Sequence, residues 1–244
     1  MDFKLETPSA LSYFSQLVQS DDSLPLLEAA ASLGQDEYAD LDVQQVLNEV
    51  DQLIFRLKRR LPADASAMHR LRVLNKLFFD ELGFRGNVNH YYDPDNSFIH
   101  CVLKTRKGIP ISLSVLWLEL ATSLGLDATG VNFPGHFLLK VMLPYPHAGQ
   151  VIIDPFTGMS LSKEALLERL NLSQLQEFEL SGLSGSAPSA EEMLKHFLTS
   201  ATDRQILTRM LGNLADIYSN QSDVSRLQQI EQRLAALTPY APKA

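Results

Sequence analysis

The sequence predicts an α+β fold in which a helical arm precedes the α+β core and a helical hairpin follows it. Within the first 82 residues, apolar side chains recur at helical spacing in three segments. A later segment, Ile111–Leu124, is apolar nearly all round, which is typical of a buried helix. Two β-like runs follow at His136–Leu143 and Gln150–Ile153. Helices that lead into a strand pair indicate the α+β class.

Composition limits the function before any motif is considered. The 244 residues include 45% hydrophobic residues, enough for a substantial core. With 21 Lys and Arg against 29 Asp and Glu, the net charge is −8. Such a chain has no general field to hold a polyanion, so we expect neither nucleic acid nor membrane as a partner. No stretch reaches the roughly 20 apolar residues of a membrane span, and no secretory signal opens the chain, which predicts a cytoplasmic protein.

The first segment, residues 1–35, is predicted to be an acidic helical arm. The first fifty residues hold ten acids and a single base, Lys4. A longer helix is predicted to start at Asp40–Asp42, with an apolar stripe of Val43, Val46, Leu47, Val50, Ile54 and Leu57. Four cations follow at positions 56 and 58–60. They favour a solvated helix end over a nucleic-acid patch, because the net charge is negative.

The central segment, residues 36–170, is predicted to be the α+β domain. A helix is expected over Ser66–Leu82 with Gly83 as its cap, followed by a loop rich in Gly, Asn, Asp and Pro. Pro110 and Gly125 bound the buried helix. We expect the two β-like runs to pair antiparallel and to pack against that helix. Another helix, Ser162–Leu170, ends the domain.

After a linker at residues 171–190, two helical segments, Glu191–Asn220 and Asp223–Leu237, are predicted to form a hairpin within residues 191–244, with Pro239 as the stop. The hairpin carries an apolar stripe of Leu211, Leu214, Ile217, Leu227, Ile230, Leu234 and Leu237. We expect part of this stripe to pack on the preceding domain and the rest to form an exposed patch for a protein partner. The oligomeric state is left open.

Three polar residues stand out in apolar surroundings: Ser112 near the start of the buried helix, His136 before the first strand and Asp154 after the second. This is the chain order nucleophile, base, acid, and neighbouring strands can bring an imidazole to a carboxylate. Each residue also has a structural interpretation. Ser112 suits a helix cap, His136 a structural histidine, and Asp154 an Asx-turn before Pro155.

The single thiol, Cys101, lies beside His100 and invites comparison with a cysteine nucleophile. Because it precedes the loop at Gly108 and does not start the buried helix, we favour a buried, inert cysteine. His90, His100 and His136 show no spacing typical of metal ligands. We therefore expect neither a metal nor a cofactor.

The motifs RKGIPISLSVLWLELATSLGL, GVNFPGHFLLKV and IDPFTG, within residues 90–160, resemble the SirB-type transglutaminase-like proteins. That resemblance implies a papain- or transglutaminase-like core. It also implies that His136 and Asp154 occupy the positions of the superfamily's base and orienting acid. The nucleophile position departs from the pattern, because alignment by Gly108 or by Gly125 places it near Pro110 or Ser112, and neither is a cysteine.

The C-terminal helices resemble a tetratricopeptide (TPR) unit through Leu214, Ala215 and Tyr218, whereas Leu227 replaces the usual small residue. The sequence thus favours a non-catalytic transglutaminase-like protein that acts as a protein-interaction or regulatory module. The alternative is a hydrolase or acyltransferase that uses Ser112, His136 and Asp154 as a triad.

Overall fold

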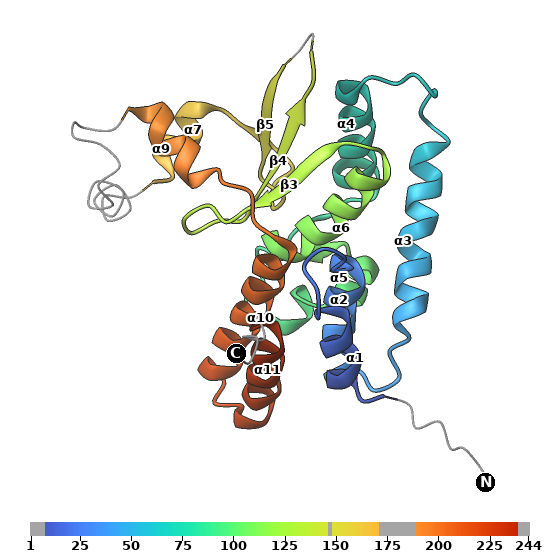
Figure 1. The fold of residues 1–244 in the computed structure, drawn as a ribbon, viewed down its shortest axis with the longest axis vertical. Coiled ribbons are helices and arrows are strands. Elements are labelled where there is room, and N and C mark those ends of the chain that lie inside the picture. The colour runs from blue at the N-terminus through green and yellow to red at the C-terminus, as the bar shows by residue number, and fades with distance from the viewer. Residues whose placement is uncertain (1–7, 146–147, 171–188, 239–244) are drawn as a thin grey trace, which may run out of the picture.

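The α+β class is confirmed by a computed structural model, which describes residues 8–145, 148–170 and 189–238. Figure 1 shows a small sheet with helix α6 behind it and a group of helices from both ends of the chain below it. In the described part of the chain, no helix is long and apolar enough to cross a membrane.

The predicted helices of the first half are present, and polar caps define their starts. Asp42 accepts hydrogen bonds from Gln44 and Gln45 N–H groups, and Ser66 accepts one from His69 N–H. Gly83, with φ +71°, follows the second of these helices in the left-handed conformation that favours glycine. The elements are α1 (Ala10–Leu17), α2 (Leu26–Ser32), η1 (Leu33–Asp36), α3 (Val43–Lys58), α4 (Ala67–Asn75), a π-helical turn η2 (Lys76–Glu81), η3 (Pro94–Asn96) and α5 (Ile99–Thr105).

The sheet has the order β3-β4-β5-β6, and all its pairs are antiparallel. Its strands are β3 (Asp127–Val131), β4 (Leu138–Leu143), β5 (Gly149–Ile153) and β6 (Ser160–Leu161). The predicted pairing of β4 with β5 is confirmed, with Lys140 opposite Ile152. The sequence analysis missed β3, because Asp127, Thr129 and Gly130 interrupt its apolar pattern.

Both faces of the sheet are covered. On one face, Leu139, Val141 and Ile153 join the main core around α6 (Pro110–Ser123). On the other, Leu138 and Ile152 join a smaller apolar cluster with leucines of α7 (Lys163–Glu168) and α9 (Ala190–Phe197). A short parallel pair, β1 (Arg85–Gly86) with β2 (Lys107–Gly108), lies at the start of α6. The expected packing of the strand pair on the buried helix is confirmed.

The C-terminal half differs from the prediction in one respect. The expected single helix Glu191–Asn220 is two helices, α9 and α10 (Asp203–Asn220). Between them the chain runs along the edge of β3, where Ala201 N–H donates to the Gly130 carbonyl at 2.8 Å. Thr202 then starts α10 with a capping box that includes Gln205. Of the linker predicted at 171–190, residues 171–188 lie outside the described part.

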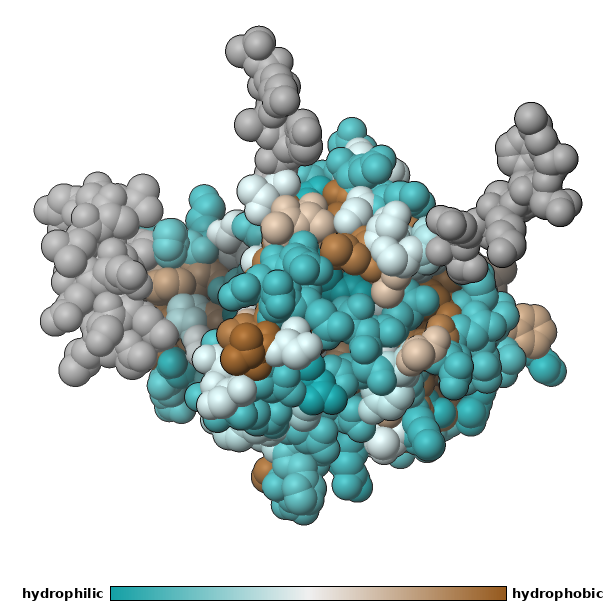
Figure 2. All heavy atoms as spheres, turned by 90° about the horizontal axis from the view of Figure 1, so that it is seen from below, coloured by the Kyte–Doolittle hydropathy of each residue, from teal (hydrophilic) through white to brown (hydrophobic). Residues whose placement is uncertain are grey.

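Helices α10 and α11 (Val224–Leu237) form the predicted hairpin, and its apolar stripe faces inward. Five of the seven stripe residues are buried; only Leu227 and Leu234 are half-buried, and both pack against the main core. The expected exposed remainder of the stripe is therefore absent. Figure 2, a view of the molecule from below, shows a mainly hydrophilic surface with scattered apolar residues. A partner would have to contact another side of these helices.

Arginines of the hairpin pair with acids in the N-terminal part of the chain. The Arg233 side chain is fully buried, and its Nε donates to Asp36 at 2.6 Å. Arg226 Nε donates to Glu37 at 2.5 Å, and Arg204 Nε donates to Asp21 at 2.5 Å. The N-terminal and C-terminal helices adjoin, because α11 contacts α1 and α10 contacts α2 (Figure 1). Arm, central domain and hairpin thus share one core.

The burial of α6 generates a stability prediction. Leu116 is 1% exposed in the main core, so Leu116→Ala should lower the free energy of unfolding by about 2–5 kcal/mol through a lost contact surface and a cavity. Urea denaturation measures the change. Val224→Ala, at a position 75% exposed on α11, should cost under about 0.5 kcal/mol as the control. Equal costs for the two variants would contradict this packing.

Candidate functional site

His136 lies at the exposed end of the sheet, directly before the buried Phe137 and β4. Its backbone N–H donates to the Phe133 carbonyl at 2.9 Å and closes a turn through Pro134 and Gly135. Burial lowers the pKa of the imidazole, the charges of Arg169 and Arg209 lower it further, and Asp154 opposes them. The ring is consequently neutral at pH 7 and lies within electrostatic reach of Asp154.

Asp154 follows β5 and is 8% exposed. Its Oδ1 accepts the Phe156 N–H at 2.9 Å, which is an Asx-turn, and its Oδ2 pairs with Arg169 Nη2 at 3.1 Å. In the described part of the chain, no hydrogen bond joins this carboxylate to His136. The structure therefore brings the two predicted residues into one neighbourhood, while the carboxylate is bonded to Arg169.

Ser112 lies in the first turn of α6 and is fully buried. Its hydroxyl donates to the Asn96 carbonyl at 2.5 Å and accepts the Ile109 N–H at 3.2 Å. A Cβ at Gly108 would lie 2.7 Å from the Ser112 Oγ, so this turn leaves no space beside the hydroxyl on that side. Among the described residues, no hydrogen bond connects Ser112 with His136.

The partner of Ser112, Asn96, organises the loop that precedes α5, and sequence analysis did not single it out. Its side-chain amide donates to the carbonyls of His90 at 2.6 Å and Tyr91 at 3.1 Å, and its Oδ1 accepts from Asn87. The loop thereby presents Tyr91, whose ring lies 6.0 Å from that of Phe156 beside Asp154. Ser112 thus ties an aromatic loop to α6.

Two arginines complete the neighbourhood of His136. Arg169 follows α7, and Arg209 comes from α10, 73 residues beyond His136 in the chain. Arg209 Nη1 donates to Asn132 Oδ1 at 3.3 Å, and its guanidinium lies 5.7 Å from the Phe137 ring centre. No short sequence pattern marked either arginine as a site residue.

Cys101 forms a separate polar cluster. Its Sγ lies 3.3 Å from His100 Nε2 and 3.7 Å from the Tyr38 hydroxyl, which donates to Asp95 at 2.6 Å. Burial raises the pKa of the thiol and lowers the pKa of the His100 imidazole. Both groups are therefore neutral at pH 7, whereas an activated cysteine is a thiolate.

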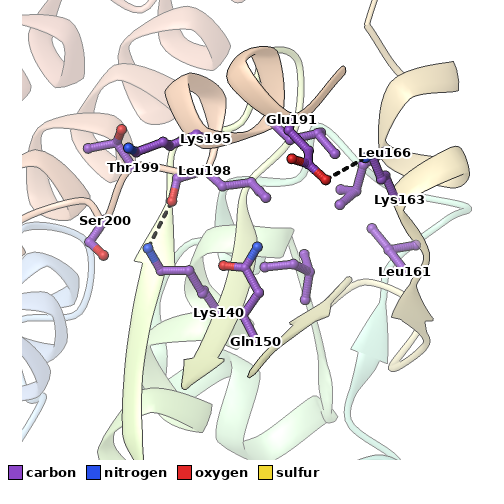
Figure 3. Close-up of a pocket in the computed structure, with 12 residues that line it drawn as sticks. Lys140, Gln150, Leu161, Lys163, Leu166, Glu191, Lys195, Leu198, Thr199 and Ser200 are labelled. Carbon is purple, nitrogen blue, oxygen red and sulfur yellow. Dashed lines mark hydrogen bonds and ion pairs between the residues drawn. The ribbon is translucent and has the colours of Figure 1, made fainter. Parts of the chain in front are cut away.

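The pocket in Figure 3, of about 690 Å³, lies between the sheet and helices α7 and α9, and it includes none of the three predicted site residues. Two of its three lysines have contacts within the fold. Lys140 Nζ donates to the Leu198 carbonyl at 2.8 Å at the end of α9, and Lys163 pairs with Glu191 at 3.4 Å. Over the described ranges, no cluster of His, Cys, Asp and Glu is arranged to hold a metal ion.

Comparisons with known proteins agree with the transglutaminase-like part of the resemblance. The model of the transglutaminase-like superfamily matches residues 44–212. A UPF0162 protein of Xylella fastidiosa is 34% identical over 224 residues, which is 92% of this chain and 75% of that protein. One from Pseudomonas aeruginosa is 29% identical over 88% of this chain and 72% of its own length. Mouse F-box only protein 21 is 47% identical over 70 residues, 29% of this chain and 11% of its own length. No solved structure matches significantly.

The matched residues extend from α3 into α10 and include Ser112, His136, Asp154 and Arg209. The chain therefore belongs to the transglutaminase-like superfamily and, within it, to the UPF0162 proteins.

The Ser112 hydrogen bonds generate the second prediction. Ser112→Ala leaves the Ile109 N–H and the Asn96 carbonyl without this partner in a buried site, and should cost about 1–3 kcal/mol of unfolding free energy. Ser123→Ala, which removes a hydroxyl bonded only to the Leu120 carbonyl near the other end of α6, should cost less and serves as the control. Thermal and urea unfolding measure both. An unchanged stability in Ser112→Ala would contradict the structural role.

Proposed function

We propose that this chain is a non-catalytic transglutaminase-like protein that acts as a protein-interaction or regulatory module. The observation that carries the proposal is the state of Ser112. A nucleophile must lie within hydrogen-bond reach of its base and of a substrate. The Ser112 hydroxyl is instead fully buried and bonded to backbone groups of Asn96 and Ile109.

The groups around His136 support the same proposal. The carboxylate of Asp154, which would orient the base in a triad, is bonded to Arg169 and to the Phe156 N–H. Pro110, at the other possible nucleophile position, has no side-chain group that could attack a carbonyl. Cys101, the one thiol of the sequence, is protonated at neutral pH because burial raises its pKa. Since none of these residues supplies an activated nucleophile or an acid that orients His136, the site is better suited to binding than to turnover.

The protein partner expected from the sequence is proposed to contact the C-terminal helices on the side of α10 that carries Arg209, because the apolar stripe of the hairpin is occupied by the core. The SirB-type subfamily and the TPR-like pattern of the hairpin remain predictions of the sequence.

Activity assays test the proposal. We expect no transamidation of casein by a fluorescent amine, no casein hydrolysis and no hydrolysis of p-nitrophenyl acetate above the level of His136→Ala. The wild-type protein and His136→Ala should both have the circular dichroism spectrum of the folded protein, so that a lack of activity is not due to unfolding. Turnover that disappears in a folded Ser112→Ala variant would instead establish a serine triad and refute the non-catalytic proposal.

A further inference from the structure

Arg209 differs from the other arginines of the C-terminal hairpin in having no acidic partner. Arg204, Arg226 and Arg233 each pair with a carboxylate, at 2.5 to 2.6 Å. For Arg209, the described residues provide the side-chain oxygen of Asn132 and the face of Phe137, and no carboxylate. It is nevertheless half-buried. A half-buried guanidinium that lacks an anion retains hydrogen-bond donors for one.

Arg169, whose charge also acts on His136, supplies an unsatisfied donor. Its Nη2 bonds to Asp154, whereas its Nη1 is buried and has no hydrogen-bond partner. Asp154 is itself fixed by the Phe156 N–H, so it holds the Arg169 guanidinium in place. Arg169 and Arg209 carry two positive charges, Asp154 carries one negative charge, and His136 is neutral. This group of residues therefore has one net positive charge. An incoming anion would compensate it.

Tyrosine rings lie near these cations, since the charge of Arg209 acts on Tyr91. The exposed Tyr92 ring lies 5.3 Å from that of Tyr91, which in turn lies 6.0 Å from Phe156. Tyr92 is 74% exposed and Tyr91 is 42% exposed, so both are available to a partner. Arginine and tyrosine are among the residue types most enriched at the centres of protein interfaces. The loop that carries the tyrosines is held by Asn96, so the surface is preorganised.

We infer that Arg169, Arg209 and His136, bordered by Tyr91 and Tyr92, bind a carboxylate of an acidic peptide segment in a protein partner. This inference rests on the proposed function, because it names the chemistry that the non-catalytic site binds. A planar carboxylate matches the paired donors of a guanidinium, and the tyrosines suit the flanking peptide. A polyanion such as RNA fits less well, because the whole chain carries a net charge of −8.

A peptide titration of the full chain tests the inference. The probe is the amidated peptide acetyl-Gly-Glu-Tyr-Glu-Gly, and its matched control has glutamine in place of both glutamates. In ¹⁵N NMR spectra, we expect the acidic probe to shift the signals of His136, Asn132 and the Arg209 side chain, and the neutral peptide to shift them weakly. Arg209→Met keeps an apolar stem over Phe137 and removes the charge, so it should weaken acidic-probe binding at least about tenfold.

The matched protein control is Arg59→Met. Arg59 also lies 5.7 Å from a phenylalanine ring, that of Phe55, but it is the residue that caps the C-terminus of α3. Arg59→Met should leave the affinity for the acidic probe unchanged. The affinity of Arg209→Lys should lie between those of the wild type and Arg209→Met. Equal binding of the neutral peptide, equal loss in both Met variants, or tighter binding of oligouridylate or inorganic phosphate would overturn the inference.

The same samples separate this inference from the proposed function. Mass spectrometry of the peptide after the titration should show it intact. Absence of binding with intact peptide would refute the acidic-peptide inference alone. Cleaved peptide would refute the non-catalytic proposal.

Discussion

Helix α6 is buried over most of its surface, and the arrangement of the other elements follows from that constraint. Ten of its fourteen residues are buried, including Trp117 at 0% exposure. An all-round apolar helix must be covered on every side. Strands β3 and β4 cover one side, α3, α4 and α5 others, and α2 and α10 bring in the two ends of the chain. The N-terminal arm and the C-terminal hairpin are therefore parts of the core that encloses α6.

The same constraint governs the start of α6, where the superfamily resemblance places a nucleophile. A buried first turn must satisfy its backbone groups internally. The Ser112 hydroxyl accepts the Ile109 N–H and donates to Asn96, and it thereby joins α6 to the loop that contains Asn96. The accessible polar residues of the site are instead His136, at the end of the sheet, and the two arginines whose charges act on it, Arg169 and Arg209. The proposed recognition role rests on the structural use of this hydroxyl, and the acidic-peptide inference rests on the uncompensated positive charge around His136.

Local patterns predicted the elements that depend on local interactions. The caps at Asp42 and Ser66, the buried helix and the β4–β5 pair were all readable, because periodicity and capping act within a few residues. The break between α9 and α10 could not be predicted in this way, because it depends on pairing with the edge of β3, which is distant in the sequence. The site shows the same division. His136 and Asp154 were found from their motifs, whereas Arg209 and Asn96 reach the site through tertiary packing that no short pattern encodes.

The central claim is that the first turn of α6 holds a structural hydroxyl and no nucleophile. Labelling of the native protein with a fluorophosphonate, followed by peptide mass mapping, tests it most directly, since this reagent modifies serines that an adjacent base activates. The account predicts no phosphonyl adduct on Ser112 at a reagent concentration that fully labels trypsin. An adduct on Ser112 that His136→Ala abolishes would contradict it.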